Sequence, residues 1–452
     1  MSISIKWDIT YKCNLFCDHC INGNSLSNTN TEPSLEETKQ IINHLSEKNI
    51  DYIHLLGGEP TMQQNFIEIL NYFNEKNIPF GFNTNGLLLG HNNMIHDIAH
   101  LKCFRNIVFS IEAPIAEIND SIRGKAVFEK TISNVEKMVR YKKENDLQHF
   151  HITINMVLCQ TNKDYLIPMI KYCVALGVDE LCLLQLIAQG NAQDKNISLT
   201  FDDELKLVKE IADIYSSVKD VIRIVPRFVR PMAIDYANKV LGKEFPSIEH
   251  GCGAGTKFAY ITNQGMLYPC DRYQQAVIEK CDNPKALSLI DNSFDEIWKL
   301  DGFGDIFSCI SHEDFCQEVV PCNNCAYLKE TCYPCPVNMI GGTKKAKEIS
   351  CIQYSKLIRE HVIQKNNKLS VTNYTIREVH SDDELYTLFH TETFETLALN
   401  KEAYLIWNEL KNLETLQYND IVALINSKYH LANADIREIL NTLIDFDYLE
   451  AV

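Results

Sequence analysis

Hydrophobic positions in the first 190 residues follow two patterns that alternate along the chain. Short apolar runs rich in β-branched and aromatic residues predict buried strands, and longer stretches with an apolar residue every three or four positions predict amphipathic helices. The helix expected at 34–49 begins with Ser34 as N-cap and Glu37 at the capping-box position. Six strands are expected, at 4–10, 51–58, 79–85, 106–113, 151–157 and 179–186. This alternation predicts an α/β fold with a parallel sheet, a partial (βα)6 barrel similar to a TIM barrel, with its chemistry at the carboxyl ends of the strands.

The pattern changes after the sixth strand, so further units are expected beyond a core at 1–195. Residues 196–250 are expected to form a helical connection. Residues 251–352 hold ten of the seventeen cysteines, and their scattered apolar content predicts a segment that needs bound ligands to fold. Residues 369–452 are expected to form strands followed by three helices, at 400–411, 416–429 and 433–447.

Composition narrows the class of protein. The 452 residues are 45% hydrophobic and 23% charged, with neither an apolar run long enough to span a membrane nor a secretory signal, so a cytoplasmic protein without a membrane partner is expected. The net charge of −17 argues against nucleic acid as a partner. Seventeen cysteines in such a chain favour metal or cluster ligation over disulfides.

Three cysteines, Cys13, Cys17 and Cys20, directly follow the first expected strand. A loop with this spacing can bind three irons of a cubane cluster and leave the fourth iron open. Zinc is the alternative, and it would need a fourth ligand such as His19 or a distant cysteine. The second strand ends in Gly57, Gly58, Glu59 and Pro60, where glycines permit close backbone approach and a carboxylate offers acceptors to an ammonium group.

The segment CNLFCDHC, followed by GGEP after the second strand, resembles the radical S-adenosylmethionine (SAM) superfamily over residues 4 to about 192. The resemblance implies that the three cysteines hold a [4Fe–4S] cluster whose open iron chelates SAM. It further implies a deoxyadenosyl radical that abstracts hydrogen from the substrate, and a reducing partner such as flavodoxin or ferredoxin. The SAM-binding residues implied are Gly57, Gly58, Glu59, Pro60, Thr84, Asn85, Gly86, Ser110, Glu112, Arg123 and Asn155, with Gly190 and Ala192 in a turn beside the adenine.

The cysteine-rich segment resembles a SPASM domain, the auxiliary-cluster extension of radical SAM enzymes that modify peptides and proteins. Two CxxC pairs only six residues apart also permit a zinc ribbon. The resemblance implies two auxiliary [4Fe–4S] clusters, hence three clusters in all. The outer cluster would be held by Cys322, Cys325, Cys332 and Cys351, and the inner one by Cys252, Cys270 and Cys335. Either Cys316, Cys309 or Cys281 supplies the fourth thiolate of the inner cluster, or one of its irons is open to substrate. Cys103, Cys159, Cys173 and Cys182 are expected to be buried apolar residues.

One carboxylate, Asp271, directly follows Cys270. In anaerobic sulfatase-maturating enzymes, which the architecture resembles, a Cys-Asp pair at this position supplies a general base, so the resemblance implies that Asp271 is catalytic. The alternative is a structural aspartate that caps a turn.

The C-terminal stretch ETFETLALNKEAYLIWNEL and the helices after it resemble a PqqD-like domain, a winged-helix module that binds leader peptides. The resemblance implies recognition of a precursor peptide through its leader by strand addition. A packing or dimerisation domain is one alternative, and a DNA-binding winged helix is another. From residue 371 onward five Lys or Arg face fifteen Asp or Glu, which disfavours DNA binding.

These resemblances imply a radical SAM maturase that crosslinks a ribosomally synthesised precursor peptide through a C–C or thioether bond, with epimerisation less favoured. Within enzymes the alternative is oxidation of Cys or Ser to formylglycine. Outside enzymes the alternative is a cluster- or zinc-stabilised binding protein without turnover.

Overall fold

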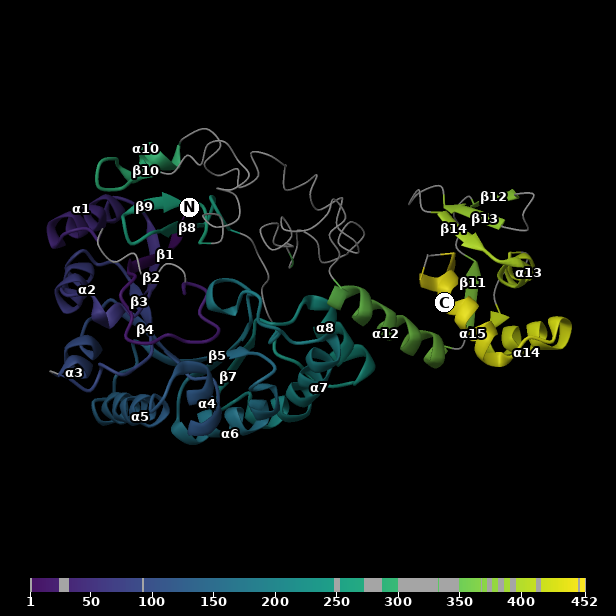
Figure 1. Cartoon of the computed structure of the whole chain (residues 1–452), viewed down its shortest axis with the longest axis horizontal. Coiled ribbons are helices and arrows are strands. Elements are labelled where there is room, and N and C mark those ends of the chain that lie inside the picture. Colours follow the sequence, from purple (N-terminus) through teal and green to yellow (C-terminus); the bar gives the residue numbers. More distant parts are fainter. Residues whose placement is uncertain are drawn as a thin grey trace. The chain divides into compact units, whose positions relative to one another are not determined.

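The computed structural model describes residues 2–23, 32–91, 93–247, 253–271, 287–299, 332, 349–366, 368–371, 376–380, 386–390, 396–411, 416–445 and 448–451. The chain divides into two compact units, Met1–Ser350 and Cys351–Val452 (Figure 1). Several proposed cluster ligands lie outside the described residues: Cys252, Cys281, Cys309, Cys316, Cys322, Cys325 and Cys335.

The first unit alternates strands and helices, as the sequence predicts. Its strands are β1 (Ile3–Thr10), β2 (Ile50–Gly57), β3 (Phe80–Thr84), β4 (Phe104–Ser110), β5 (His151–Leu158), β6 (Glu180–Gln185) and β7 (Arg223–Pro226). Its helices are α1 (Leu35–Ser46), α2 (Phe66–Glu75), α3 (Met94–Ala99), α4 (Ala116–Arg123), α5 (Phe128–Glu144), α6 (Leu166–Leu176), α7 (Phe201–Val218) and α8 (Pro231–Asp235). Strands β1 to β7 are neighbours in sequence order and all pair in parallel, which confirms the expected α/β class.

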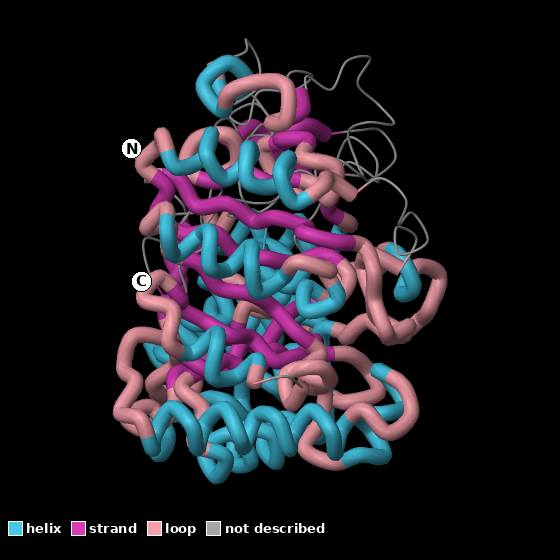
Figure 2. The backbone as a smooth tube through the Cα atoms, turned by 90° about the vertical axis from the view of Figure 1, so that its left-hand side faces the viewer, coloured by secondary structure: helices cyan, strands magenta, loops and turns pink. Residues whose placement is uncertain are grey.

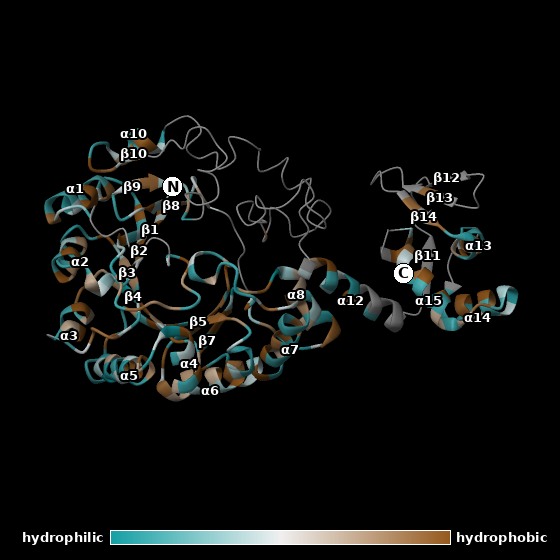
Figure 3. Ribbon diagram, in the orientation of Figure 1, coloured by the Kyte–Doolittle hydropathy of each residue, from teal (hydrophilic) through white to brown (hydrophobic). Residues whose placement is uncertain are grey.

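Helices cover the outer face of the curved sheet, as Figures 1 and 2 show. Their inward sides are apolar, because the hydrophobic residues of α1 and α2 recur at helical spacing (Figure 3). A row of aromatic rings runs through this core, with centroid separations of 4.9–6.1 Å: Trp7, Phe73, Phe80, Phe104 and Phe150. The capping box of Ser34 and Glu37 is present at the start of α1.

Two expectations for the middle of the chain need correction. Residues 196–250 contain α7 and α8, but also the parallel strand β7, whose short apolar run extends the sheet beyond β6. In the cysteine-rich segment, β8 (Phe258–Ile261) pairs in parallel with β1, and β9 (Met266–Tyr268) and β10 (Leu287–Ser288) continue the sheet. With the short helix α10 (Phe294–Trp298), these strands bury apolar side chains, so part of this segment packs as protein core.

The second unit begins within α12 (Ile349–Asn366) and contains two three-stranded antiparallel sheets. One has the order β15 (Leu416–Gln417), β11 (Lys368–Val371), β16 (Leu449–Ala451), and the other β12 (Ile376–His380), β13 (Tyr386–His390), β14 (Thr396–Leu399). Helices α13 (Lys401–Leu410), α14 (Tyr418–Tyr429) and α15 (Asn433–Asp445) lie close to their expected positions. Their core includes Trp407, Ile425 and Leu440. No helix among the described residues is long and apolar enough to cross a membrane.

Candidate functional site

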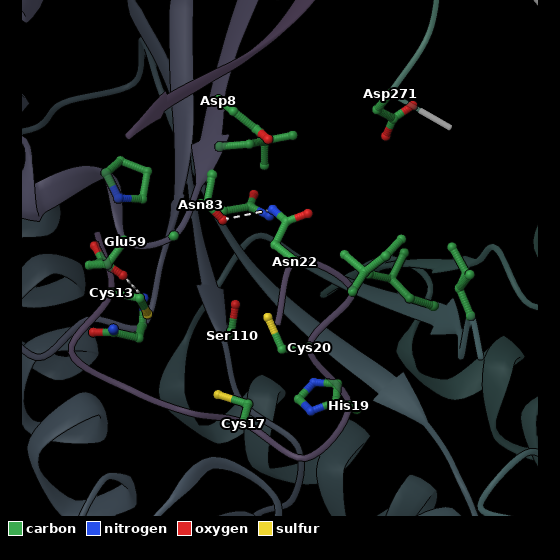
Figure 4. Close-up of a pocket in the computed structure, with 18 of the residues that line it drawn as sticks. Asp8, Cys13, Cys17, His19, Cys20, Asn22, Glu59, Asn83, Ser110 and Asp271 are labelled. Carbon is green, nitrogen blue, oxygen red and sulfur yellow. Dashed lines mark hydrogen bonds between the residues drawn. The ribbon is translucent and has the colours of Figure 1, made fainter. Parts of the chain in front are cut away.

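A cavity of about 670 Å³ lies where the parallel strands end (Figure 4). Its wall includes residues from the carboxyl ends of β2, β3, β4 and β6, together with the loop that follows β1. Cys13, Cys17 and Cys20 line it together, as their position after the first strand predicts.

The three loop cysteines are free thiols. Burial raises the pKa of Cys13 to about 11 and also raises the pKa of Cys17 and Cys20. The thiolates therefore need a bound cation to offset their charge, and a cluster supplies one, so the donor set fits an iron–sulfur cluster. One nitrogen of the His19 ring is engaged within the protein, since its Nε2 lies 3.0 Å from Glu112 Oε1. Among the described residues, no three His, Cys, Asp or Glu side chains are arranged to hold a single metal ion.

A turn after β6, Gly190–Ala192, holds the cysteine loop in place. The Asn191 side-chain amide donates to Cys17 O at 2.9 Å, and its backbone N–H donates to Cys20 O at 2.9 Å. Gly190 has φ +58°, and a Cβ there would lie 2.4 Å from Cys20 O. These contacts fix the turn against the cysteine loop, and its predicted place beside the adenine stays a prediction.

The two glycines of the GGEP segment bring the end of β2 against the loop after β1. Gly57 has φ +119°, and a Cβ would lie 2.1 Å from Thr10 O; at Gly58 a Cβ would lie 2.2 Å from Lys12 O. Gly58 N donates to Thr10 O at 2.8 Å. The observed close approach is thus between two backbone segments of the protein.

Glu59 is only 1% exposed and its carboxylate accepts hydrogen bonds within the protein. Its Oε1 accepts from Thr61 Oγ1 at 2.6 Å and from Thr84 Oγ1 at 2.7 Å, and its Oε2 accepts from Asn85 N at 2.6 Å. Glu59 therefore joins the ends of β2 and β3. Glu59 also lines the cavity, and its role as an acceptor for an ammonium group stays a prediction.

A buried group of charges lies beside the cysteine loop. Glu112 Oε1 accepts from Arg123 Nη1 at 2.8 Å, and Glu112 Oε2 accepts from Val157 N at 2.8 Å. Burial alone would raise the pKa of Glu112, but His19 and Arg123 hold it below its ordinary value. Two buried nitrogens of cavity-lining residues, His19 Nδ1 and Arg123 Nε, have no partner among the described residues. Unpartnered buried groups fit a polar ligand, as expected for SAM.

Some of the residues predicted to bind SAM line the cavity and others do not. Asn85 and Ser110 line the cavity, as do Gly57, Gly58, Glu59, Pro60 and Arg123. Asn155 is not among the lining residues, and its carbonyl accepts from Ile111 N at 3.0 Å within the sheet. Glu112 does not line the cavity, but it contacts the lining residues Arg123 and His19.

Several lining residues were not anticipated from the sequence: Lys6, Asp8, Tyr11, Asn22, Arg227, Arg230 and Tyr260. Tyr260 Oη donates to Asp8 Oδ2 at 2.6 Å, and Tyr11 Oη lies 3.4 Å from Tyr260 Oη. Burial raises the pKa of Asp8 to about 7. Asp271 also lines the cavity, and its Oδ2 lies 2.9 Å from Lys6 Nζ.

Among the cysteines assigned to auxiliary clusters, the structure describes three. Cys270 and Cys332 are partly buried, and Cys351 is buried. Cys103, Cys159, Cys173 and Cys182 are buried, as the sequence predicts.

Comparison with known proteins identifies the class of domain. Residues 7–173 match the radical SAM superfamily. The chain is 25% identical over 300 residues to mycofactocin maturase MftC of Mycolicibacterium smegmatis, covering 66% of this chain and 70% of that protein. It is 24% identical over 311 residues to the AdoMet-dependent heme synthase of Oleidesulfovibrio alaskensis, covering 65% of this chain and 74% of that protein. It is 24% identical over 331 residues to the PqqA peptide cyclase of Rhodopseudomonas palustris, covering 72% and 79% respectively.

The fold is similar to that of Streptococcus suis SuiB bound to its precursor peptide SuiA. The TM-score is 0.60 at 18% identity, and the match covers 78% of this chain and 76% of that one. The chain thus carries a radical SAM domain at residues 7–173, and it is an enzyme.

Proposed function

We propose that this enzyme modifies a ribosomally synthesised precursor peptide. The observation that carries the proposal is the cavity itself, where the cysteine loop and the unpartnered nitrogens of His19 and Arg123 share one space with Asp8, Tyr260 and Asp271. At about 670 Å³ it has room for a cofactor and a short substrate segment. The similarity to proteins named mycofactocin maturase and PqqA peptide cyclase, and the fold shared with a protein bound to a precursor peptide, support a peptide substrate.

In this proposal Cys13, Cys17 and Cys20 hold a [4Fe–4S] cluster, and His19 and Arg123 offer polar contacts to SAM. When bound, these cofactors supply a deoxyadenosyl radical that removes a hydrogen atom from the substrate. The protein's own residues fix the geometry, because Asn191 and Gly58 hold the cysteine loop and Glu112 orients Arg123 and His19.

We propose a C–C or thioether crosslink as the product, with epimerisation less favoured. The cysteine-rich residues 251–352 are proposed to form a SPASM domain with two auxiliary clusters, giving three [4Fe–4S] clusters. Asp271 is one candidate for the general base, on the resemblance to sulfatase-maturating enzymes, and its place in the cavity wall is compatible with that role; Asp8 in the same wall is the other candidate.

The second unit is proposed to bind the leader as a PqqD-like domain. A cavity of about 460 Å³ lies between the start of α13 and α15, and acidic side chains gather on its wall: Glu402, Asp435 and Glu438. A leader that carries Lys or Arg would complement these charges, while main-chain hydrogen bonds to a sheet edge would supply most of the affinity.

The test is anaerobic co-expression with the short peptide encoded beside the gene, followed by mass spectrometry. A crosslink removes two hydrogen atoms from the peptide mass and leaves its length unchanged. The variant in which Cys13, Cys17 and Cys20 are all Ala should leave the peptide unmodified and form no deoxyadenosine, while its auxiliary iron is retained. Unmodified peptide beside an enzyme that cleaves SAM with that peptide present would reject the proposal.

A second candidate is heme synthesis, because the similarity to AdoMet-dependent heme synthase is nearly as strong as that to MftC. Formylglycine formation is a third, which Asp271 in the cavity wall favours. The products distinguish the three candidates. Heme has its own absorption spectrum and formylglycine reacts with aldehyde reagents, whereas a crosslinked peptide gives neither signal.

A further inference from the structure

Two carboxyl groups that belong to neighbouring parts of the sheet line the cavity, and they differ in their surroundings. Asp8 lies on β1 and is 5% exposed, whereas the Asp271 side chain, just after β9, is 35% exposed. Asp8 Oδ2 accepts a hydrogen bond from Tyr260, and no partner for Oδ1 occurs among the described residues. Figure 4 shows both carboxyls at the same side of the cavity, away from Cys17.

We propose that Asp8, oriented by Tyr260, is the group that takes a proton from the substrate during turnover. The inference rests on the proposed peptide modification and names a residue that no sequence motif indicated. Tyr260 is a positioning residue, because its hydroxyl contacts Asp8 and holds the carboxylate at one of its two oxygens.

The chemistry of a crosslink requires such a group. A hydrogen atom leaves the substrate carbon, and that carbon then bonds to a nucleophile that still carries a proton. As the new bond forms, the bond from nucleophile to hydrogen breaks, one electron passes to an acceptor of the iron–sulfur class, and the proton passes to a base. The Asp8 carboxylate accepts that proton and becomes a neutral carboxylic acid.

The surroundings of Asp8 suit it better for this role than those of Asp271. Burial raises the pKa of Asp8 to about 7, close to the pH at which an enzyme works, and a general base is most effective there. Asp271 Oδ2 is instead engaged by Lys6 Nζ at 2.9 Å. The charged and titratable groups facing Asp8 are Tyr260, Asp271, Lys6, Tyr11 and Cys20.

The first experiment measures modified peptide formed per deoxyadenosine, over a range of pH, with the peptide encoded beside the gene. In the unsubstituted holoenzyme, the amount of modified peptide per deoxyadenosine should fall as the pH is lowered through about 7. Asp8→Asn should lower the ratio by roughly 10²- to 10⁴-fold and flatten its pH profile. Tyr260→Phe, which removes the hydrogen bond to Asp8, should move the midpoint to higher pH.

Matched variants sharpen the result. Tyr268 lies on β9 opposite Tyr260 and does not line the cavity. The pH profile of Tyr268→Phe, which also removes a hydroxyl, should therefore match that of the unsubstituted enzyme. Asp271→Asn removes the competing carboxylate, and because the negative charge of Asp271 contributes to the raised pKa of Asp8, the titration should persist with its midpoint moved to lower pH. A profile that flattens in Asp271→Asn and persists in Asp8→Asn would overturn the proposal.

A second readout needs no substrate. Infrared titration of anaerobically reconstituted enzyme with ¹³C-labelled aspartate should show one carboxyl with a midpoint near 7 that is missing in Asp8→Asn. A midpoint near the ordinary value of about 4 would reject the role of Asp8. If the peptide is not modified at all, the proposed function fails, and the infrared result still decides whether Asp8 is poised to take a proton.

Discussion

The side-chain amide of Asn191 donates a 2.9 Å hydrogen bond to the backbone carbonyl of Cys17, 174 residues earlier in the chain. A second bond, from the Asn191 backbone to Cys20 O, fastens the same loop. The loop that carries the proposed cluster ligands is thus held by the turn after β6, so its geometry depends on a residue far from it in the sequence.

Asn191→Ala should therefore loosen the cluster loop. Loss of one hydrogen bond of this kind destabilises locally by about 1 kcal/mol, which corresponds to roughly fivefold faster release of iron to a chelator. The matched control is Gln193→Ala, an exposed residue of the same turn region. Equal rates of iron release from the two variants would contradict an anchoring role for Asn191.

Glu112→Gln should be strongly destabilising, because it leaves the buried Arg123 without its charge partner. Removal of one member of a buried pair typically costs about 3–5 kcal/mol in chemical unfolding. Glu180→Gln is the control: its partner Arg223, at 3.0 Å, has a side chain 76% exposed, so the change should be below about 1 kcal/mol.

The same variant makes a pH prediction. The pKa of Glu112 lies below its ordinary value in the folded protein, so its contribution to stability is present above about pH 4.3 and is lost as pH falls further. The difference between the unsubstituted protein and Glu112→Gln should shrink in acid. A difference that stays constant from pH 6 to strongly acidic pH would show that the pair contributes through packing alone.

Asp8 should show the opposite pH dependence. Its pKa is raised to about 7 in the folded protein, against about 4 in an unfolded chain, so ionisation destabilises the fold as pH rises between these values. Asp8→Asn should gain stability relative to the unsubstituted protein over this range, by at most roughly 4 kcal/mol, and the difference should stay constant at higher pH. Unfolding by urea at several pH values measures it, with the exposed Asp291→Asn as control.

The acidic cavity of the second unit predicts charge-dependent binding of the leader. Asp435→Asn should weaken binding of a Lys- or Arg-bearing leader by about two- to fivefold at low salt, and added salt should diminish the difference. Asp420→Asn is closely matched, since both aspartates lie in the first turn of a helix and only Asp435 lines the cavity. Equal effects of the two substitutions, measured by calorimetry, would place the leader elsewhere.

The sequence predicts well those features that depend on local pattern. Examples are strand β1 with the cysteines that follow it and the glycines that end β2. They can be recognised because hydrophobic periodicity and residue spacing are properties of a few neighbouring residues. Asp8 and Tyr260 lie 252 residues apart, and their contact depends on which strand β8 pairs with. No local pattern encodes that choice. Glu59 shows a different limit, since its residue type is compatible with a ligand contact and with internal hydrogen bonds, and the sequence does not reveal that Thr61 and Thr84 donate to its carboxylate.

The pairing of β8 with β1 places Lys6 opposite Tyr260, on the strand that leads directly into the cysteine loop. Tyr260 in the cavity wall and the cysteine loop are therefore connected through one pair of hydrogen-bonded strands. The register of that pair fixes where Tyr260 lies relative to the loop that would carry the proposed cluster. Because successive side chains of a strand point to opposite faces, a slip of one residue would turn Tyr260 away from Asp8. A single-residue insertion in β8 would thus disable the proposed proton transfer, although every cysteine and every residue of the SAM motifs would still be present.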